Sequence, residues 1–267
     1  MNDYISQAEQ MFFKHKITEK PPLHFFSAHL HNTYELLYFI EGDATHVIED
    51  RKYKLKKGDL IIIPPFKHHF IQIDSSARYE RYNILFDAVK HKVESVSLIP
   101  EDVDVINIEN NEIAKDIFRK CAFYFENSPE GIFTNLMSSL LSELFYSLYL
   151  FPQTLTPKSS PVPPIVSKAL EYINENLFTI KDIKELAVHL FVSESYLFRL
   201  FKRELHQTPK QHICEKRLLA AQKMISSGEK PSKAALSCGF TDYTTFYRNY
   251  TTFFGHSPSQ REQIVKS

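Results

Sequence analysis

Three histidines and one glutamate in the N-terminal half have the types and spacing of a ligand site. His29, His31 and Glu35 follow one another closely, and His69 comes later in the chain. Imidazole nitrogens and carboxylate oxygens bind divalent transition metals, and adjacent strands can bring such side chains to one point. The same side chains could instead line a pocket for a small effector. A third reading is that they are paired residues of the fold, or surface imidazoles, without a ligand.

The segments around these four residues have the pattern of short β-strands. Residues 35–40 form a compact apolar run that ends at the turn signal Glu41-Gly42-Asp43. Residues 60–63 are rich in β-branched side chains and stop at Pro64-Pro65. Short strands separated by turns in this way predict a β-sandwich or barrel over residues 23 to about 106.

Helical periodicity follows the predicted strands. Ile113, Ile117, Cys121 and Phe125 recur every four residues, and a wide apolar stripe then runs through residues 133–148. Such a pair of amphipathic helices could cover the barrel or build a dimer interface. An apolar stripe by itself does not identify its partner, so both readings stay open.

A proline-rich segment and a change of charge divide the chain. Residues 152–164 contain five prolines together with Ser and Thr, a composition that resists helix and sheet and predicts an exposed linker. Residues 1–164 carry a net charge of −5, and residues 165–267, with 15 basic and 10 acidic side chains, carry +5. A basic C-terminal part suits a polyanionic partner.

Two stretches near the C-terminus are copies of each other, 49 positions apart. Each begins with a residue that can cap a helix and continues with apolar residues at helical spacing. Each has an arginine on the opposite face and ends in a Thr-Pro or Ser-Pro turn. The matching positions are Ser193, Leu197, Arg199, Phe201, Leu205, Thr208 and Pro209, with Asp242, Phe246, Arg248, Tyr250, Phe254, Ser257 and Pro258. This pattern predicts a recognition helix that is present twice in one chain.

Each predicted recognition helix follows a shorter helix, as in a helix-turn-helix unit. Asp182 and Glu185 have the spacing of a capping box, and Pro231 is favourable at the first position of the corresponding second helix. Residues 211–226 read as a long linking helix between the two units. Helical spacing turns eight polar or aromatic residues outward: Ser195, Phe198, Arg199, Lys202, Tyr243, Thr244, Tyr247 and Arg248.

The segments SESYLFRLFKRELHQTPKQHICEKRLLAAQKMI and GFTDYTTFYRNYTTFFGHSPSQR resemble the DNA-binding domain of the AraC/XylS family of bacterial transcription regulators. The resemblance covers roughly residues 165–265. It implies seven helices, with two recognition helices that enter successive major grooves about 34 Å apart. It also implies base contacts from Ser195, Phe198, Arg199, Thr244 and Arg248, while Lys202 is better placed for phosphate.

This segment departs from the family pattern at four positions. His206 stands where the family usually has glycine, Lys230 is a poor helix cap, Ala234 replaces a larger aliphatic residue, and Gln260 replaces an aromatic one. These departures question the rigidity of the second unit's first helix rather than the fold.

The N-terminal ligand residues also resemble a family pattern. His29-x-His31-x3-Glu35-x6-Gly42, followed by Gly58-x5-Pro64 and His69, is similar to the two cupin motifs. Phe66 stands where the second motif has glycine, and Ile73 where it has asparagine. AraC-type regulators frequently carry a cupin-like domain that binds a small effector, often a sugar, without a metal. The resemblance therefore implies effector contacts at His29, His31, Glu35 and His69, with a metal at the same residues as the weaker alternative.

The sequence thus predicts an α+β multidomain protein. We expect a cupin-like sensor barrel at residues 1–106 and a helical dimerisation or covering region at 107–151. A linker at 152–164 and an AraC-type DNA-binding domain at 165–267 complete the chain.

The expected function is sequence-specific regulation of transcription, more commonly activation in this family, in response to a small molecule. The expected partners are a double-stranded DNA operator, a small-molecule effector such as a carbohydrate, RNA polymerase and a second copy of the chain. No cofactor or catalytic residue is expected, because no P-loop, no G-x-S-x-G and no recognisable Cys–His pair is present.

Without a recognisable signal peptide or membrane span, the chain is expected in the bacterial cytoplasm, associated with the nucleoid. Two alternatives stay open. One is a metal-binding cupin sensor or enzyme fused to a DNA-binding domain, and the other is a regulator with a vestigial barrel that a protein partner or expression level controls.

Overall fold

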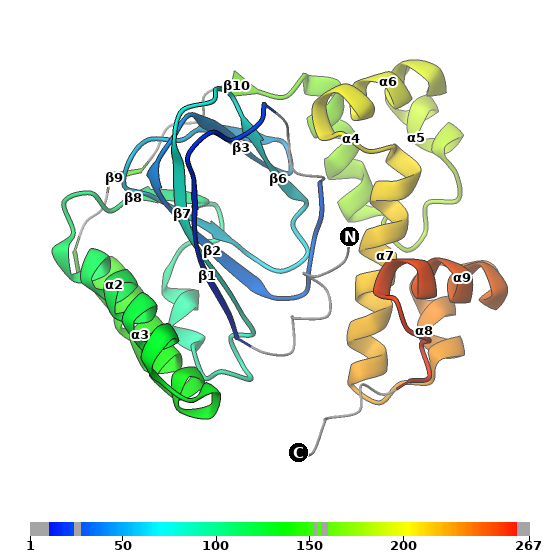
Figure 1. Cartoon of the computed structure of the whole chain (residues 1–267). Coiled ribbons are helices and arrows are strands. Elements are labelled where there is room, and N and C mark those ends of the chain that lie inside the picture. Colours follow the sequence, from blue (N-terminus) through cyan, green and yellow to red (C-terminus); the bar gives the residue numbers. More distant parts are fainter. Residues whose placement is uncertain (1–10, 24–27, 152–153, 156–159, 261–267) are drawn as a thin grey trace. The chain divides into compact units, whose positions relative to one another are not determined.

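The computed structural model describes residues 11–23, 28–151, 154–155 and 160–260 (Figure 1). The chain divides between Pro161 and Val162 into an N-terminal and a C-terminal unit. Residues 152–153 and 156–159 of the predicted linker lie outside the described residues. No helix in the described ranges is long and apolar enough to cross a membrane.

The N-terminal unit is built from two antiparallel sheets. The strands are β1 (Phe12–Thr18), β2 (Tyr34–Glu41), β3 (Ala44–Ile48), β4 (Arg51–Lys54), β5 (Asp59–Ile63), β6 (His69–Ile73), β7 (Tyr79–Phe86), β8 (Val105–Asn107), β9 (Thr154–Leu155) and β10 (Ser160–Pro161). One sheet has the order β1-β7-β2-β5-β8-β9, and the other has the order β10-β4-β3-β6. The predicted β-rich N-terminal domain is therefore confirmed.

The sequence did not predict three of the four strands at the edges of the sheets. β1 lies before residue 23, where the strand pattern was expected to begin, and pairs with β7, where Phe12 stands opposite Leu85. Two short strands lie in or beside the segment interpreted as a linker. β9 pairs with β8, and β10 pairs with β4. Pro161 is compatible with this position because β10 is an edge strand, where a missing backbone N–H is tolerated.

The six-stranded sheet buries apolar side chains on both faces, because side chains alternate along each strand. Leu37 and Phe39 of β2 join a core with Ile48 and Ile71 from the other sheet. The intervening residue Tyr38 belongs to a second core on the opposite face. The interior of the barrel and the helix-covered outer face are thus separate cores.

Helices α2 (Glu112–Asn127) and α3 (Glu130–Leu150) cover that outer face (Figure 1). Met137, Leu141 and Phe145 of α3 pack in the same core as Tyr38. The predicted face of α2 is only partly right, since Ile113 and Phe125 are exposed. Each step of exactly four residues rotates by about 40° in a helix of 3.6 residues per turn, so the predicted stripe leaves the buried face at both ends. A short 3₁₀ helix, η1 (Glu94–Leu98), precedes β8.

The C-terminal unit is helical, as predicted. Its elements are α4 (Pro164–Glu175), α5 (Ile183–His189), α6 (Glu194–Leu205), α7 (Pro209–Ser226), α8 (Pro231–Ser237) and α9 (Tyr243–Phe254). The long helix α7 joins the group α4–α6 to the pair α8–α9 (Figure 1). These are the six helices in the described part of the C-terminal unit, whereas the family resemblance implies seven. Residues 261–267, which follow α9, lie outside the described residues.

Candidate DNA interface and candidate ligand site

Local caps fix the start of both predicted recognition helices. The Ser193 hydroxyl accepts a hydrogen bond from the Tyr196 backbone N–H at 3.2 Å, and the Asp242 carboxylate accepts one from Thr245 N–H at 2.7 Å. Such a cap satisfies one of the backbone donors that a helix leaves unpaired at its start. Both helices end in the left-handed conformation, at His206 and Gly255. The duplicated sequence therefore folds into two helices with matching starts and ends.

The two helices bury one face and expose the other. On α6 the side chains of Leu197, Leu200 and Phe201 are buried, and on α9 those of Phe246 and Tyr250 are buried. The Tyr250 hydroxyl also donates a hydrogen bond to Gln222 of α7. All six predicted DNA-contact residues are exposed: Ser195, Phe198, Arg199, Lys202, Thr244 and Arg248.

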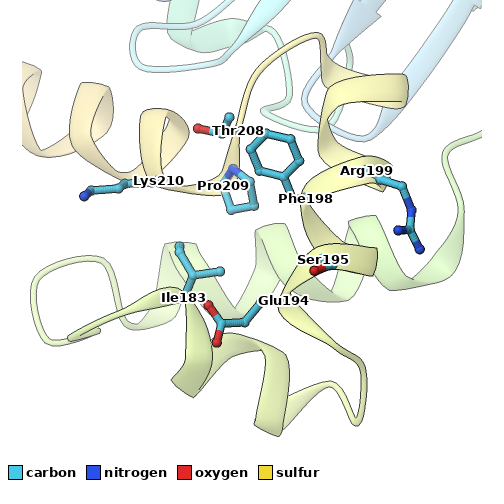
Figure 2. Close-up of a pocket in the computed structure, with 8 residues that line it drawn as sticks. All are labelled: Ile183, Glu194, Ser195, Phe198, Arg199, Thr208, Pro209 and Lys210. Atoms are coloured by element: carbon cyan, nitrogen blue, oxygen red, sulfur yellow. The ribbon is translucent and has the colours of Figure 1, made fainter.

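A groove of about 510 Å³ lies beside the start of α6 (Figure 2). Ser195, Phe198 and Arg199 line it from α6, and Lys210 lines it from the start of α7. Sequence reasoning missed Lys210, although it directly follows the Thr208-Pro209 turn that closes the first copy. Thr208 holds this turn through a capping box with Gln211, whose side chain and backbone both bond to it.

The predicted capping box at α5 has a different geometry. The Asp182 carboxylate accepts a hydrogen bond from Glu185 N–H at 2.9 Å, as predicted. The Glu185 side chain, however, accepts from the backbone of Lys181 rather than that of Asp182. Its carboxylate also accepts the Tyr172 hydroxyl of α4, so the residue links two helices.

Arg217 of α7 ties both helix-turn-helix units to the linking helix. Its guanidinium donates to the carbonyls of Leu177 at 2.7 Å and Ile180 at 2.6 Å, in the loop before α5. It also donates to the carbonyl of Gly239 at 2.9 Å, in the turn after α8. Because the guanidinium is planar and presents its donors in a fixed fork, one side chain holds both loops in register.

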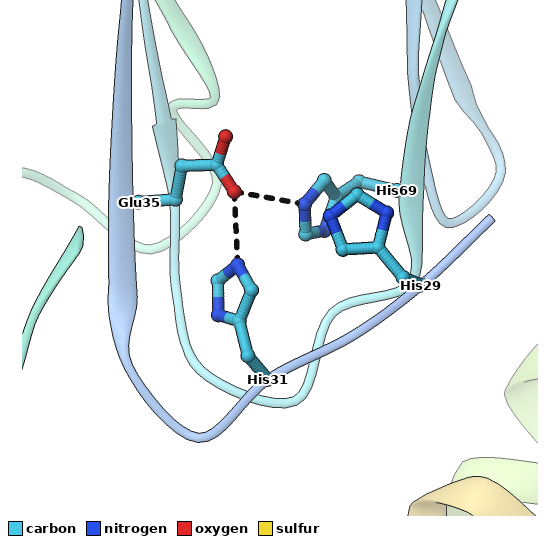
Figure 3. A group of neighbouring side chains, drawn as sticks. All are labelled: His29, His31, Glu35 and His69. Carbon is cyan, nitrogen blue, oxygen red and sulfur yellow. Dashed lines mark hydrogen bonds and ion pairs between the residues drawn. The ribbon is translucent and has the colours of Figure 1, made fainter. Parts of the chain in front are cut away.

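In the barrel, the structure brings the four predicted ligand residues together (Figure 3). One potential ligand atom from each of His29, His31, Glu35 and His69 lies within 4.8 Å of the others. An antiparallel bridge between the backbones of His29 and His69 places these two residues side by side. His31 follows on the same face two residues later, as alternation along an extended chain requires.

Two of the histidines contact the carboxylate directly. The Glu35 Oε2 lies 2.9 Å from His31 Nε2 and 3.0 Å from His69 Nε2. Burial acts to raise the pKa of Glu35, but the interactions with His31 and His69 outweigh it and hold that pKa well below its usual value. The carboxylate is therefore ionised inside the barrel.

Sequence reasoning missed other polar side chains that are buried in this unit. His46 of β3 stacks 6.0 Å from the ring of His69, and burial lowers the pKa of His46 to about 3. Arg81 and Asn83 of β7 pair in register with Phe39 and Leu37, so they share the interior face of the sheet. These polar residues stand in strands beside other polar residues, such as Glu80 in β7 and Thr45 in β3, and sequence alone attributes such positions to a solvent-facing side.

These observations define a class of protein: a β-barrel with a cluster of buried polar side chains, and a helical domain with two helix-turn-helix units. A family model for an AraC-like ligand binding domain matches residues 16–108. A second model, for a helix-turn-helix domain, matches residues 186–263. The chain belongs to the AraC family of transcription regulators, with an N-terminal ligand-binding domain.

The chain is similar to operon regulators, two of which are named for the raffinose and lactose operons. It is 26% identical over 241 residues to the raffinose operon transcriptional regulatory protein RafR of Pediococcus pentosaceus, covering 88% of this chain and 86% of that protein. It is 21% identical over 260 residues to the Msm operon regulatory protein of Streptococcus mutans, covering 91% and 88%. It is also 27% identical over 127 residues to the lactose operon transcription activator of Staphylococcus xylosus, covering 47% and 46%.

Proposed function

We propose that this DNA-binding regulator reads an operator with α6 and α9 and activates transcription when a small molecule, in this proposal a sugar, binds in its barrel. The observation that carries the proposal is the pair of capped helices, each of which exposes an arginine at the equivalent position, Arg199 and Arg248. A lone exposed arginine is common on solvated helices. Two at matching positions of a duplicated helix-turn-helix unit favour base contact.

The side chains on the exposed faces suit distinct roles. Arg199 and Arg248 can each donate two hydrogen bonds to guanine, and Phe198 and Thr244 can contact the methyl group of thymine. Ser195 is able to bond to more than one base. Lys210 lines the Figure 2 groove, and Lys202 is exposed on α6; both carry the charge needed for phosphate contacts.

The proposed effector site is the barrel interior. Arg81 and Asn83 supply buried polar groups there, and among the described residues the Asn83 Oδ1 has no hydrogen-bond partner. A buried acceptor of this kind is expected to bond to a ligand or to water. The names of the raffinose and lactose operon regulators support a carbohydrate effector for this chain.

We further propose a cytoplasmic homodimer that contacts RNA polymerase and has no enzymatic activity. The helices that cover the barrel expose several large apolar side chains, including Phe123, Tyr149 and Leu150, each 60% exposed or more. The proposal takes these exposed apolar side chains as points of contact with a partner. In the proposal, these helices pair with those of a second copy.

Gel-shift titration on an operator found by genome-wide binding-site mapping tests the DNA interface. Arg199→Ala and Arg248→Ala should each weaken operator binding by about 1–3 kcal/mol, or roughly 5–150-fold, through loss of a bidentate base contact. Arg203→Ala is the matched control, because this exposed arginine of α6 pairs with its neighbour Glu204 at 2.6 Å. Unchanged affinity in both test variants would refute the assignment.

A further inference from the structure

We propose that Glu194 and Tyr243, the first residues of α6 and α9, are the side chains by which this regulator distinguishes the two halves of its operator. Glu194 selects a cytosine in one half, and Tyr243 makes no such selection in the other. The inference rests on the proposed function, because it requires both helices to read bases. Its basis is the likeness of the two exposed helix faces, position by position.

At three outward positions the two helices carry the same chemical groups. The spacing of 49 residues matches a hydroxyl with a hydroxyl, an aromatic ring with an aromatic ring, and an arginine with an arginine. The matched pairs, all exposed, are Ser195 with Thr244, Phe198 with Tyr247, and Arg199 with Arg248. Similar groups at matching positions favour similar bases, so these three pairs alone would direct α6 and α9 to similar sequences.

The fourth outward position differs between the helices. Directly after its cap, α6 begins with Glu194, whereas α9 begins with Tyr243. An ionised carboxylate only accepts hydrogen bonds, while a phenol both donates and accepts and also carries an apolar ring. Since the N-terminal residues of a recognition helix contact base edges, this position is placed to read a base in both units.

The surroundings of Glu194 favour a contact with cytosine. Glu194 is exposed and lines the groove of Figure 2 together with Arg199 and Lys210. DNA phosphates repel a carboxylate on this face, which costs affinity unless a base donates a hydrogen bond to it. The N4 amino group of cytosine is the donor in the major groove that glutamate and aspartate accept from.

Tyr243 has different surroundings on α9. Its ring centre lies 5.7 Å from that of Phe246 and 6.3 Å from that of Tyr247, so it packs on the aromatic side chains of its own helix. The ring is still 41% exposed. An exposed aromatic ring suits the methyl group of thymine and carries no charge that calls for an amino group. We therefore expect no cytosine preference at this position of the α9 half.

Glu194 also has an ordinary structural role. It is the acidic residue in the first turn of α6, where a negative charge interacts favourably with the helix dipole. That role stabilises the helix whatever DNA is bound, so its loss weakens binding to all operators alike. Base selection predicts a loss that is confined to one base at one position, and the two roles can therefore be separated.

The test is gel-shift titration of the full chain on the mapped operator and on duplexes with each other base at one position at a time. The α6 half is the one in which Arg199→Ala changes the base preference. There we expect the wild type to prefer cytosine at one position by roughly fivefold or more. Glu194→Ala should abolish this preference and leave the affinity for the three other bases equal or higher, because a charge that repels phosphate is lost.

Two further variants complete the comparison. Glu171→Ala removes the same charge from an exposed position of α4 and should keep the cytosine preference. Tyr243→Glu gives α9 the first residue of α6 and should create a cytosine preference at the matching position of the other half.

The inference is overturned if the wild type lacks the cytosine preference, if the preference survives Glu194→Ala, or if Tyr243→Glu gains none. The last outcome decides the matter even if Glu194→Ala does not fold. Operator binding that is insensitive to both Arg199→Ala and Arg248→Ala refutes the proposed function instead.

Discussion

The two helix-turn-helix units are equivalent at their recognition helices but differ in the turns that precede them. From α6 to α9 the equivalent residues are 49 apart, as shown by the caps Ser193 and Asp242. From α5 to α8 they are 48 apart, because α5 spans residues 183–189 and α8 spans 231–237. The second turn therefore contains one more residue than the first. The two recognition helices are therefore close copies, whereas the turns that join them to the preceding helices differ in length.

The left-handed residue in each turn shows the same difference. In the first unit it is Phe191, with φ 55°, and the side chain is 96% exposed. In the second unit it is Gly239, with φ 80°, packed against the backbone of Phe178. The first turn thus tolerates a side chain at a conformational cost, whereas the second leaves no space for one.

The largest expected effect is on this second turn. A Cβ on Gly239 would lie 2.5 Å from the Phe178 carbonyl oxygen, so Gly239→Ala adds a steric clash to left-handed strain. We expect it to lower the free energy of unfolding by about 2–5 kcal/mol, measured by chemical denaturation.

Gly255→Ala is the control for backbone strain alone. It has nearly the same φ, 79°, but no atom within 4 Å of the added Cβ, and should cost about 1–2 kcal/mol. Equal losses in the two glycine variants would show that the second turn is no more tightly packed than the end of α9.

A second effect concerns α7, which both units share. Burial raises the pKa of Glu215 to about 7, above its ordinary value of 4.5. The folded state therefore holds this proton more tightly than the unfolded chain, and the associated stability is present below pH 4.5 and is lost as the pH rises through 7.

Glu215→Gln should accordingly raise the free energy of unfolding by about 2 kcal/mol at pH 8 and by much less at pH 4. Thermal melts across this range, with Glu171→Gln at an exposed position of α4 as the control, provide the measurement. A gain in the free energy of unfolding that does not change with pH would mean that ionisation of Glu215 does not destabilise the folded state.

The third prediction compares the recognition helices themselves. The exposed Lys202 of α6 has Thr251 as its counterpart on α9, and Lys210 adds a second cation beside the first helix. We therefore expect Arg199→Ala to weaken operator binding more than Arg248→Ala, within the range of about 1–3 kcal/mol for each. A larger loss for Arg248→Ala in paired gel-shift titrations would reverse this ranking.

The smallest predicted effect is a gain in stability. Phe191→Gly removes left-handed strain of about 1–2 kcal/mol, and the extra chain entropy of glycine offsets about half of it. The variant should melt at a slightly higher temperature. A lower melting temperature would show that the exposed ring makes a stabilising contact that the first turn needs.

The parts of the structure that could be predicted from sequence are those set by neighbouring residues. The caps at Ser193 and Asp242 join a side chain to a backbone group three residues away, so their spacing is visible in the chain. The Ser257–Gln260 pair shows that even a local contact can be missed when a residue departs from the family pattern. Gln260 reads as a departure from the family, yet it forms the reciprocal hydrogen bonds with Ser257 that Gln211 forms with Thr208.

The features that escaped prediction depend on distant partners. β1 becomes a strand because β7 offers it an edge about 70 residues away, and nothing local in Phe12–Thr18 marks that pairing. The polar positions His46, Arg81 and Asn83 were missed because alternation alone does not identify which face of a strand is buried. His29, His31, Glu35 and His69 were predicted as a group, but the hydrogen bonds that the carbonyls of Thr33 and Lys67 accept from the rings of His31 and His69 were not.

The fork of Arg217 also has a consequence for the DNA. One guanidinium donates hydrogen bonds to the carbonyls of Leu177, Ile180 and Gly239. The rotation of one recognition helix relative to the other is therefore fixed. B-form DNA turns once in about 10.5 base pairs, so a single inserted base pair between the two contact segments rotates one of them by roughly 34°. For the proposed operator, base substitutions should weaken binding by graded amounts, whereas a single insertion or deletion between the two contact segments should cause a large loss of affinity.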